Sequence, residues 1–560
     1  MTTTTKNDVK SEPVSRRRRK RSRASLFSQG EPMVWLTGGG LVISLLMIVG
    51  LLVLVLFHGM GTFWPSELPR FVTKDGQVVM GEVTRQERYE DEDSGGRKLV
   101  RTGNFDLSGE HFRWIDDSSI VDRTLPPWAL VIERTEWGIF YGFPKAFIFE
   151  GETVAADPAG VYEKYQKYHK EVSERRERRR KLETVDVGKV NHVLEKARLA
   201  IKSAELKYGK GSPSWERATK TYEAAEQRAT EDFKDIRLKI DALNRSNARY
   251  VMLMETAQGQ EKQVPLAGIV RAYPANSLDF TGRTTIYLAR WIEFLVDEPR
   301  EANSEGGVYP AIFGTVVMTL IMSLAVMPFG IMAALYLREY ARAGTIISIV
   351  RISINNLAGV PSIVFGVFGL GFFCYFIGAS IDQLFFAEHL PNPTYGKGGV
   401  LWAALTLALL TLPVVIVATE EALSAVPNSM REGSYACGAS KWQTIKRIIL
   451  PRAMPGIMTG MILAMARGAG EVAPLMLVGA VKLAPELPID GIFPYIHAER
   501  SFMHLGFHIY DLGFQSQNSE AAKPMVFSTT LLLIGIVFLL NVVAVRLRTR
   551  LRKKFESAAF

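Results

Sequence analysis

Arg467 and Glu471 lie four residues apart in an otherwise apolar stretch at residues 465–475. An arginine at the centre of a membrane helix costs about 2.5 to 3.5 kcal/mol, so Arg467 is not expected to face lipid. On a continuous helix Glu471 would share its face, and Gly468 and Gly470 would let a helix or ligand approach the backbone. The pair is either a structural ion pair or an anion site, in which the guanidinium is exchanged between Glu471 and a tetrahedral oxyanion.

A second stretch that could contact a ligand lies in the third apolar run. Gly359 and Pro361 interrupt regular helix hydrogen bonding there. Freed backbone groups are tolerated at membrane depth only when they are buried in protein or face water. Asn356 and Ser362 therefore either contact the anion or satisfy polar groups of neighbouring helices. We favour the second role and keep both residues as candidates for a substrate path.

A charged island at residues 431–451 separates the fourth and fifth apolar runs. If these runs cross a membrane, the island must emerge as a loop large enough to fold. A short helix with a small-residue face could seat closely in a groove of a partner protein, with Gly438 turning the chain. The residues that would form this face are Ser434, Ala436, Gly438 and Ala439. The alternative is an amphipathic loop that lies on the membrane surface.

The composition limits the class of protein. The 560 residues are 48% hydrophobic and 22% charged, averages that conceal a membrane part and a soluble part. The two cysteines, Cys374 and Cys437, cannot form a disulfide framework for the soluble part, which has none. The net charge is +10, but basic residues lie beside apolar runs or are mixed with acids, which argues against nucleic-acid binding. His111, His169 and His192 lack the spacing of metal ligands, so we expect no metal site and no catalytic residue.

The amino-terminal region predicts a tail and one membrane helix. Residues 1–30 are polar, contain a basic run at 16–21 and show no apolar periodicity, which predicts a disordered tail. The apolar stretch that follows is too long for the core of a signal peptide and predicts a transmembrane helix within residues 31–60. The basic run would hold the tail in the cytoplasm, with an affinity for anionic membrane lipid.

Residues 61–306 contain no run long enough to span a bilayer and are expected to form a periplasmic α+β insert. Short alternating segments flank turn signals at Asp75-Gly76 and Gln258-Gly259-Gln260, which predicts a β-rich base. Residues of about 160–245 carry apolar positions at helical spacing on both sides of a Gly-rich break. Ser212 suits an N-cap and Pro213 a first helical position, so this part predicts an antiparallel helical hairpin. The hairpin is either a docking or spacer arm or a structural insertion.

Five further apolar runs follow the insert, at residues 307–337, 352–381, 398–419, 455–481 and 525–545. With the first span they make six, so both termini are expected in the cytoplasm, which agrees with the basic residues of the loops. The sequence thus predicts a membrane core at 307–546, with a cytoplasmic loop at 420–455 and a basic cytoplasmic tail at 547–560.

Three segments, in order, resemble one known family. Residues 355–370, Ala466-Arg467 and residues 470–475 closely resemble PstA-type permeases of bacterial phosphate ABC importers. The island resembles the coupling loop of ABC-importer permeases, which has glutamate, two small residues, a glycine and Ile-x-Leu-Pro. Here Gly433-Ser434 stands where the family usually has two alanines. The resemblance covers roughly 305–546 without loops, and nothing about the insert is carried over.

The resemblance implies a mainly α, polytopic inner-membrane protein with the type I ABC-importer permease fold. It implies three partners: a PstC-like second permease, a PstB-like ATPase dimer that binds ATP and Mg, and a PstS-like periplasmic phosphate-binding protein. This chain has no Gly-x-x-x-x-Gly-Lys-Ser/Thr loop, so no cofactor of its own is expected and ATP hydrolysis would be the partner's.

The residue roles that follow are expectations of two kinds. The phosphate path would be lined by Arg467 and Glu471, with Ser362 and Asn356 as further candidates. The residues that would couple the chain to the ATPase are Arg431, Glu432, Gly438 and Trp442. A permease for sulfate or molybdate, a membrane receptor with an outer sensor domain, and an enzyme in the outer region are the alternatives.

Overall fold

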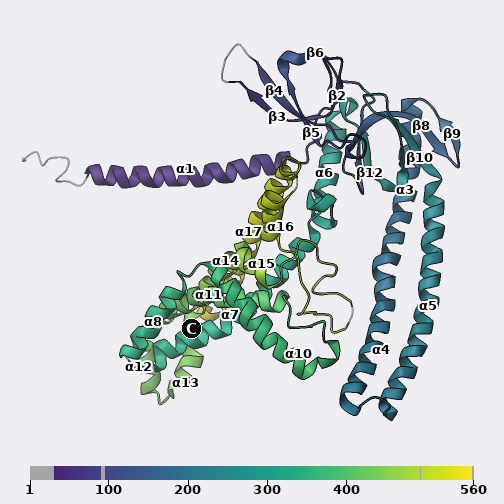
Figure 1. The fold of residues 1–560 in the computed structure, drawn as a ribbon. Coiled ribbons are helices and arrows are strands. Elements are labelled where there is room, and N and C mark those ends of the chain that lie inside the picture. Colours follow the sequence, from purple (N-terminus) through teal and green to yellow (C-terminus); the bar gives the residue numbers. More distant parts are fainter. Residues whose placement is uncertain (1–30, 90–94, 343, 492, 517, 558–560) are drawn as a thin grey trace, which may run out of the picture. The chain divides into compact units, whose positions relative to one another are not determined.

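The computed structural model describes residues 31–89, 95–342, 344–491, 493–516 and 518–557 (Figure 1). The predicted disordered tail at 1–30 lies outside the described residues. The chain forms two compact units, residues 1–57 and 58–560. The described part of the first unit is helix α1 (Glu31–Gly61), whose last turn belongs to the second unit. The most apolar 18-residue window of α1 has a mean hydropathy of 3.1, which is that of a membrane span.

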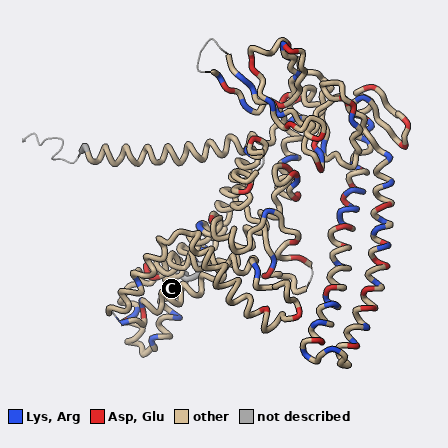
Figure 2. The backbone as a smooth tube through the Cα atoms, in the orientation of Figure 1, with Lys and Arg blue, Asp and Glu red and all other residues tan. Residues whose placement is uncertain are grey.

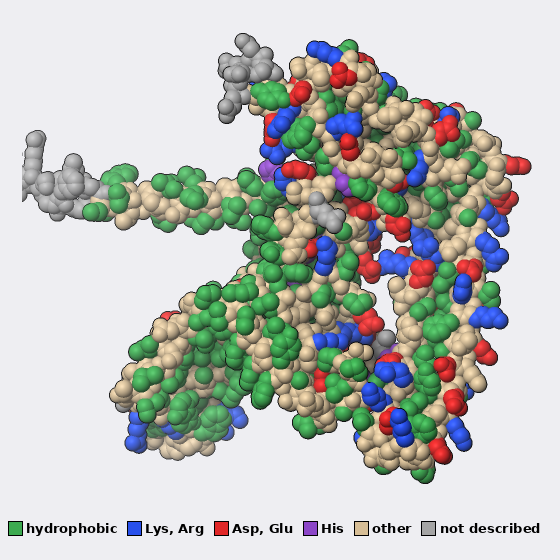
Figure 3. All heavy atoms as spheres, in the orientation of Figure 1, with side chains coloured by type: hydrophobic (Ala, Val, Ile, Leu, Met, Phe, Trp, Pro, Cys, Tyr) green, Lys and Arg blue, Asp and Glu red, His purple; other side chains and the backbone are tan. Residues whose placement is uncertain are grey.

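Within the described residues, six helices are long and apolar enough to cross a membrane, which confirms the predicted number. They are Met33–Gly61, Tyr309–Tyr340, Ser362–Phe385, Val400–Ser424, Lys441–Gly470 and Ser519–Arg550. The helices that build the last five are α7 (Tyr309–Leu335), α9 (Ser362–Phe368), α10 (Ala379–Phe385), α11 (Val400–Ser424), α13 (Lys441–Thr444), α14 (Leu450–Gly470) and α17 (Ser519–Ser557). Figure 3 shows hydrophobic side chains over much of the visible face of this helical part.

Two of the predicted spans have different bounds from those expected. The third begins at Ser362 and not near residue 352, because α8 (Thr345–Leu357) is a separate helix that ends before Pro361. A residue that precedes proline is disfavoured in the helical conformation, so a break there follows from the sequence. The fifth span ends at Gly470 and does not continue to residue 481. The ring of Pro474 would collide with the carbonyl group of Gly470 in a continuous helix.

Small residues bring α14 against α11. A Cβ atom on Gly460 would lie 2.5 Å from the Cβ of Ala418, and one on Gly456 would lie 2.5 Å from the Cβ of Ala422. Glycines and alanines four residues apart allow helix backbones to approach closely in a membrane. Of the most apolar 18-residue window of each helix, 67% is buried in α11 but only 11% in α17. Helix α11 is therefore central to the bundle of this chain.

The part of the chain between α1 and α7, residues 62–308, contains none of the six apolar helices and is called the outer region below. It contains three antiparallel sheets and one short strand pair. The first sheet has the order β2-β1-β6, with β1 (Arg70–Thr73), β2 (Val78–Met80) and β6 (Ile120–Thr124). The second has the order β3-β4-β5, with β3 (Glu82–Arg88), β4 (Gly96–Arg101) and β5 (Phe112–Asp116). The third has the order β11-β10-β8-β7-β12, with β9 (Glu152–Ala155) beside β8. Its other strands are β7 (Leu130–Arg134), β8 (Phe140–Phe149), β10 (Tyr250–Glu255), β11 (Glu261–Pro265) and β12 (Ile269–Pro274); β13 (Pro299–Arg300) pairs with β14 (Glu305–Gly306).

The two predicted β-turns of this region are confirmed. Gly76 has a φ of +74° between β1 and β2, and Gly259 has a φ of +84° between β10 and β11. Both values lie in the left-handed region that favours glycine. The strands on either side pair in antiparallel register, Val72 with Val78 and Glu255 with Glu261.

The predicted helical hairpin is confirmed, together with its predicted N-cap and first helical residue. Helix α3 (Pro158–Lys181) continues through a π-helical turn into α4 (Val187–Tyr208), and α5 (Pro213–Ala248) returns beside it (Figure 1). The Ser212 side chain accepts a hydrogen bond from Trp215 N, and Pro213 is the first helical residue. In Figure 2 basic and acidic residues alternate along both arms. Lys202 Nζ donates to Leu390 O at 2.5 Å, so α4 contacts the segment that follows α10.

A buried charge network joins the third sheet to α6 (Phe280–Val296), the helix that precedes α7. The carboxylate of Glu133 on β7 lies 2.6 Å from Arg271 and 2.5 Å from Arg290. Arg290 also donates to the hydroxyl of Tyr273 at 2.6 Å and to the carbonyl of Phe63 at 3.1 Å. Burial alone would raise the pKa of Glu133, but Arg290 and Arg271 more than offset it, so this pKa lies below its ordinary value.

We expect Glu133→Gln to destabilise the outer region by about 3 to 5 kcal/mol, because it leaves the buried guanidinium of Arg290 without a counter-charge, whereas Arg271 keeps its pair with Glu293. The stabilisation by Glu133 should be present at neutral pH and be lost as the pH falls through its folded-state pKa. The temperature at which a protease cuts the outer region of the purified protein measures the effect. Asp235→Asn is the matched control, because its pair with Lys239 is 2.6 Å long but both side chains are more than half exposed. An equal effect of the two substitutions would contradict a structural role of the network.

Candidate functional site

Arg467 and Glu471 meet at the break that ends α14. Arg467 Nε lies 3.6 Å from Glu471 Oε1. The expectation that both share one continuous helical face is wrong, because α14 ends at Gly470 and Glu471 is extended, with φ −77° and ψ 135°. The carboxylate returns to the guanidinium from the short connection to α15 (Ala473–Val478).

The guanidinium of Arg467 keeps its hydrogen-bonding capacity. A separation of 3.6 Å is an ion pair but is too long for a hydrogen bond. Within the part of the chain that the structure describes, the Arg467 side chain makes no hydrogen bond to protein. Its side chain is 35% exposed and that of Glu471 is 22% exposed. The five N–H donors of the guanidinium are thus available, in a fork that matches a tetrahedral oxyanion.

The two glycines between the charged residues serve different purposes. A Cβ on Gly468 would lie 2.3 Å from the Sδ of Met322, so the end of this α7 side chain occupies the space that the glycine leaves open. No atom lies within 4 Å of the place where Gly470 would carry a Cβ. The first glycine therefore leaves room for a neighbouring helix, whereas the second leaves open space next to the ion pair.

Asn356 and Ser362 are not joined to the ion pair. Asn356 is exposed near the end of α8, and Ser362 is the half-buried first residue of α9. Among the described residues, neither side chain hydrogen-bonds to Arg467, to Glu471 or to a neighbouring helix. The helix that Ser362 begins does reach the site, because a Cβ on Gly366 would lie 2.8 Å from the Cα of Pro474. The structure thus brings α9 and α15 together, but not the two predicted side chains.

The charged island folds as two short helices. Helix α12 (Asn428–Ala436) and α13 (Lys441–Thr444) are joined by a turn at Gly438, whose φ of +78° confirms the predicted turn. Ser440 caps α13 in a capping box with Gln443. The Ser434 hydroxyl lies 2.8 Å from that of Thr444 and is buried. Ser434 therefore joins the two helices, and its predicted place on a partner-facing surface is wrong.

Arg431 fastens the island to the membrane helices. Its guanidinium donates to Val426 O at 2.6 Å and to Leu423 O at 2.8 Å, and it pairs with Glu339 at 3.1 Å. Lys441 donates to the carbonyl oxygen of Glu339 as well. Arg431 is thus a positioning residue that faces inward. Glu339 was not predicted as a partner, although it is an isolated carboxylate directly after the second apolar run.

The outward side of the island carries different residues. Glu432 is exposed, Tyr435 is 43% exposed and Trp442 is 58% exposed. Lys446 and Arg447 are exposed beside them. Figure 2 shows basic residues at the end of the helical part where Figure 1 labels α12 and α13. An exposed tryptophan beside charged and small residues is typical of a protein-binding surface.

Comparisons with known proteins concern the carboxyl-terminal part. A family model described as binding-protein-dependent transport system inner membrane component matches residues 326–556. The phosphate transport system permease protein PstA 1 of Mycobacterium tuberculosis (strain CDC 1551 / Oshkosh) is 43% identical over 175 residues, 31% of this chain and 52% of that protein. PstA of Yersinia pestis is 39% identical over 178 residues, 32% of this chain and 54% of that protein.

A further relative, the probable ABC transporter permease protein YqgH of Bacillus subtilis, is 34% identical over 204 residues, 36% of this chain and 62% of that protein. The chain therefore spans about half to three-fifths of the length of these relatives. The family match includes the island and the Arg467–Glu471 pair, and it excludes the sheets and the helical hairpin.

Proposed function

We propose that the chain, whose residues 326–556 match the model of binding-protein-dependent transport system inner membrane components, is a permease subunit of an ATP-driven phosphate importer. The permease would form the path for inorganic phosphate and couple it to ATP hydrolysis by another subunit. The names of two of these relatives, both phosphate transport system permease proteins, support phosphate as the substrate.

The observation that carries the proposal is that the guanidinium of Arg467, at the helix break, makes no hydrogen bond to the described residues. Its side chain is 35% exposed in the isolated chain. A partly exposed charge in a membrane span has a high free-energy cost if it faces lipid. This surface is therefore expected to line a water-filled path or to be covered by protein. A second, PstC-like permease that faces Arg467 would complete the path, in which phosphate replaces Glu471 on the guanidinium for part of the cycle.

The proposed orientation follows from charge. The island, with Lys446 and Arg447, and the basic end of α17 would lie in the cytoplasm, as the positive-inside rule requires. Both termini would then be cytoplasmic, and residues 61–306 would form a periplasmic insert ahead of the permease core at 307–546. A PstS-like binding protein would deliver phosphate on the periplasmic side.

The energy source would be a PstB-like ATPase dimer that binds ATP and Mg and contacts the island. The permease is then a non-catalytic subunit without a cofactor of its own. Closure of the ATPase dimer would move α12 and α13, and the continuous helix from Lys441 to Gly470 would carry this motion to Arg467. Phosphate binding at Arg467 should be weak, because an ion that is held tightly at mid-membrane cannot leave.

The proposal is tested by purifying the chain from its native membrane with its bound subunits and reconstituting it in liposomes. We expect an ATPase and a second permease to co-purify, and ATP-dependent uptake of labelled phosphate once the binding protein is added. Unlabelled sulfate and molybdate serve as competitors, because the arginine fork fits any tetrahedral oxyanion. Stronger competition by sulfate or molybdate than by unlabelled phosphate would show that this anion, and not phosphate, is the substrate. Recovery without an ATPase would contradict the transporter assignment and favour a receptor.

A further inference from the structure

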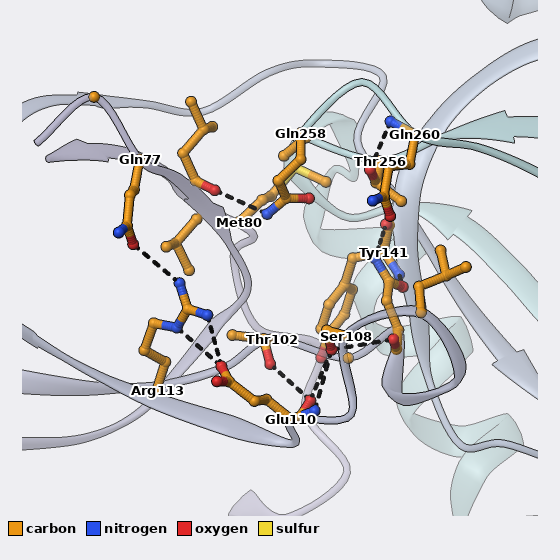
Figure 4. Close-up of a pocket in the computed structure, with 17 residues that line it drawn as sticks. Gln77, Met80, Thr102, Ser108, Glu110, Arg113, Tyr141, Thr256, Gln258 and Gln260 are labelled. Carbon is orange, nitrogen blue, oxygen red and sulfur yellow. Dashed lines mark hydrogen bonds and ion pairs between the residues drawn. The ribbon is translucent and has the colours of Figure 1, made fainter.

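A cavity of about 600 Å³ in the outer region has its charges paired within the protein (Figure 4). Arg113 and Glu110 are its charged lining residues within the described chain, and the Arg113 guanidinium donates to Glu110 at 2.7 and 3.0 Å. A further Arg113 nitrogen donates to the Gln77 side chain at 3.3 Å. The cavity thus presents no unpaired charge, and its lining selects no class of ligand. The surface of α6 in the same region is more specific.

Helix α6 (Phe280–Val296) exposes an apolar face. Its large apolar side chains that are between 38% and 76% exposed are Phe280, Leu288, Ile292, Leu295 and Val296. The other exposed residues of α6 are Thr281 and Thr285, and the Thr285 hydroxyl donates to Thr281 O at 2.9 Å. The exposed face therefore carries no charge, and Thr285 needs no water to satisfy its hydroxyl. An exposed apolar surface of this kind marks a contact with a membrane or with a protein.

The charged residues of α6 all face the outer region. Arg290 and Glu293 form ion pairs with residues of the third sheet at 2.5 and 2.8 Å, and Arg283 pairs with Glu67 at 4.0 Å. The charged side chains of α6 are thus paired within the protein and lie away from the apolar face. A helix that is charged on one side and apolar on the other has the pattern of a helix at a membrane surface.

The amino-terminal half of α6 contacts the end of the first membrane span, Met33–Gly61. The Tyr287 hydroxyl donates to Met60 O at 3.0 Å. The ring of Trp64, three residues beyond the span, lies 6.0 Å from the ring of Phe280 and 5.6 Å from that of Tyr287. This half of α6 therefore lies beside the point at which the span ends. Tryptophan and tyrosine rings at the end of a span are typical of the interface between membrane and water.

The carboxyl-terminal half of α6 is bonded to the start of the next span. Val308 N donates to Phe294 O at 2.8 Å, and Tyr309 N donates to Asp297 O at 3.2 Å. Tyr309 is the first residue of α7 and of the span Tyr309–Tyr340. Helix α6 thus lies where one membrane span ends and the next begins.

We propose that α6 is an interfacial helix whose apolar face enters the lipid bilayer beside the ends of α1 and α7. Lipid is the occupant, because this face carries no charge and adjoins the ends of two membrane spans. Protein interfaces usually contain direct hydrogen bonds as well, for which the large apolar side chains of this face offer no group. The helix would hold the outer region at the membrane surface. The proposal stands independently of phosphate transport, since α6 lies outside the family match.

The test places a nitroxide label on this face in the full chain, reconstituted in nanodiscs of phosphatidylcholine and phosphatidylglycerol. Leu288→Cys and Ile292→Cys provide the two attachment sites, and because both side chains are exposed, the substitutions should leave the fold intact. Cys437→Ser removes the exposed native cysteine, and the same chain without a new cysteine gives the background from buried Cys374.

Two reference labels replace side chains of matched exposure. Leu288 is 54% exposed, compared with 55% for Val42 on the first span and 56% for Leu238 on the charged hairpin. The measurement is the rate of collision with oxygen divided by that with a water-soluble nickel chelate. We expect this ratio at both α6 sites to be on the order of 10-fold higher than at Leu238→Cys and to approach that at Val42→Cys, since the apolar face of an interfacial helix lies about 5 to 10 Å into the boundary of headgroups and acyl chains.

Two outcomes would overturn the proposal. A ratio at both α6 sites equal to that at Leu238→Cys would place the face in water. Low collision rates with both reagents would show that protein covers the face, either another subunit or a second copy of the chain. Loss of phosphate uptake, with the labels on α6 still in lipid, would refute only the proposed transport function.

Discussion

Replacing Arg467 with alanine is expected to lower phosphate uptake by on the order of 100-fold or more while the complex still assembles. A hydrogen bond to a charged group contributes about 1.5 to 3 kcal/mol, and each 1.4 kcal/mol is about tenfold, so the loss of a two-bond contact to phosphate gives about this factor. The side chain removed is the one with free N–H donors at the break that ends α14. Uptake of labelled phosphate into proteoliposomes measures the loss, and subunit recovery shows whether assembly is intact.

A double substitution separates an anion site from a structural ion pair. Arg467→Ala alone leaves the carboxylate of Glu471 without its partner 3.6 Å away. Adding Glu471→Gln removes that unpaired charge. If the arginine serves only to neutralise Glu471, the double variant should regain uptake. If the guanidinium binds phosphate, the double variant should remain inactive, and Arg467→Lys should restore only part of the rate, because an ammonium group lacks the planar fork.

Recovery of uptake in the double variant would therefore remove Arg467 from the phosphate path. Gly468→Ala is the control for helix packing, since a Cβ there would lie 2.3 Å from Met322. Because the end of the Met322 side chain can move, we expect this variant to lower uptake only as far as it lowers recovery of the folded complex. A loss of uptake that always accompanies a loss of assembly, in the Arg467 variants as well, would indicate a packing role.

The parts of the fold that depend on local sequence were predictable. Six spans, the turns at Gly76 and Gly259 and the N-cap at Ser212 follow from hydropathy, a left-handed glycine and a capping side chain. The break after Gly470 was not predicted, although Pro474 carries the signal, because the apolar run continues across it. Hydropathy identifies membrane residues but does not show where a helix ends.

The parts that depend on distant residues were not predictable. Ser434 was assigned to an exposed face because of its size, whereas its hydrogen bond to Thr444 turns it inward. Arg431 was recognised only as part of a motif, and its partner Glu339 lies 92 residues earlier. These sites arise from tertiary packing, which no single stretch of sequence records.

Replacing Trp442 with alanine is expected to uncouple the chain from its ATPase. Trp442 is 58% exposed on α13, a helix that is fixed by the Ser440–Gln443 capping box and by the bond between Ser434 and Thr444. A tryptophan at the centre of an interface commonly contributes at least about 2 kcal/mol, which is roughly 30-fold in affinity. Co-purification of the ATPase with the tagged chain, and ATP hydrolysis stimulated by loaded binding protein, should both fall accordingly.

Trp137→Ala is the matched control, because Trp137 is 56% exposed but lies in the outer region. It should retain the ATPase, whereas Trp442→Phe should keep most of it, since an aromatic ring remains at the interface.

Arg431→Ala should also weaken recovery of the ATPase, but for a different reason: α12 loses its attachment to Leu423 and Val426 and no longer presents Glu432 in a fixed position. Full recovery of the ATPase with Trp442→Ala would show that the ATPase does not bind the surface around Trp442. Because the helix from Lys441 to Gly470 is continuous, movement of the island must displace the Arg467 end of α14 unless the helix bends, so the proposed ATPase surface and the proposed phosphate site lie on one helix.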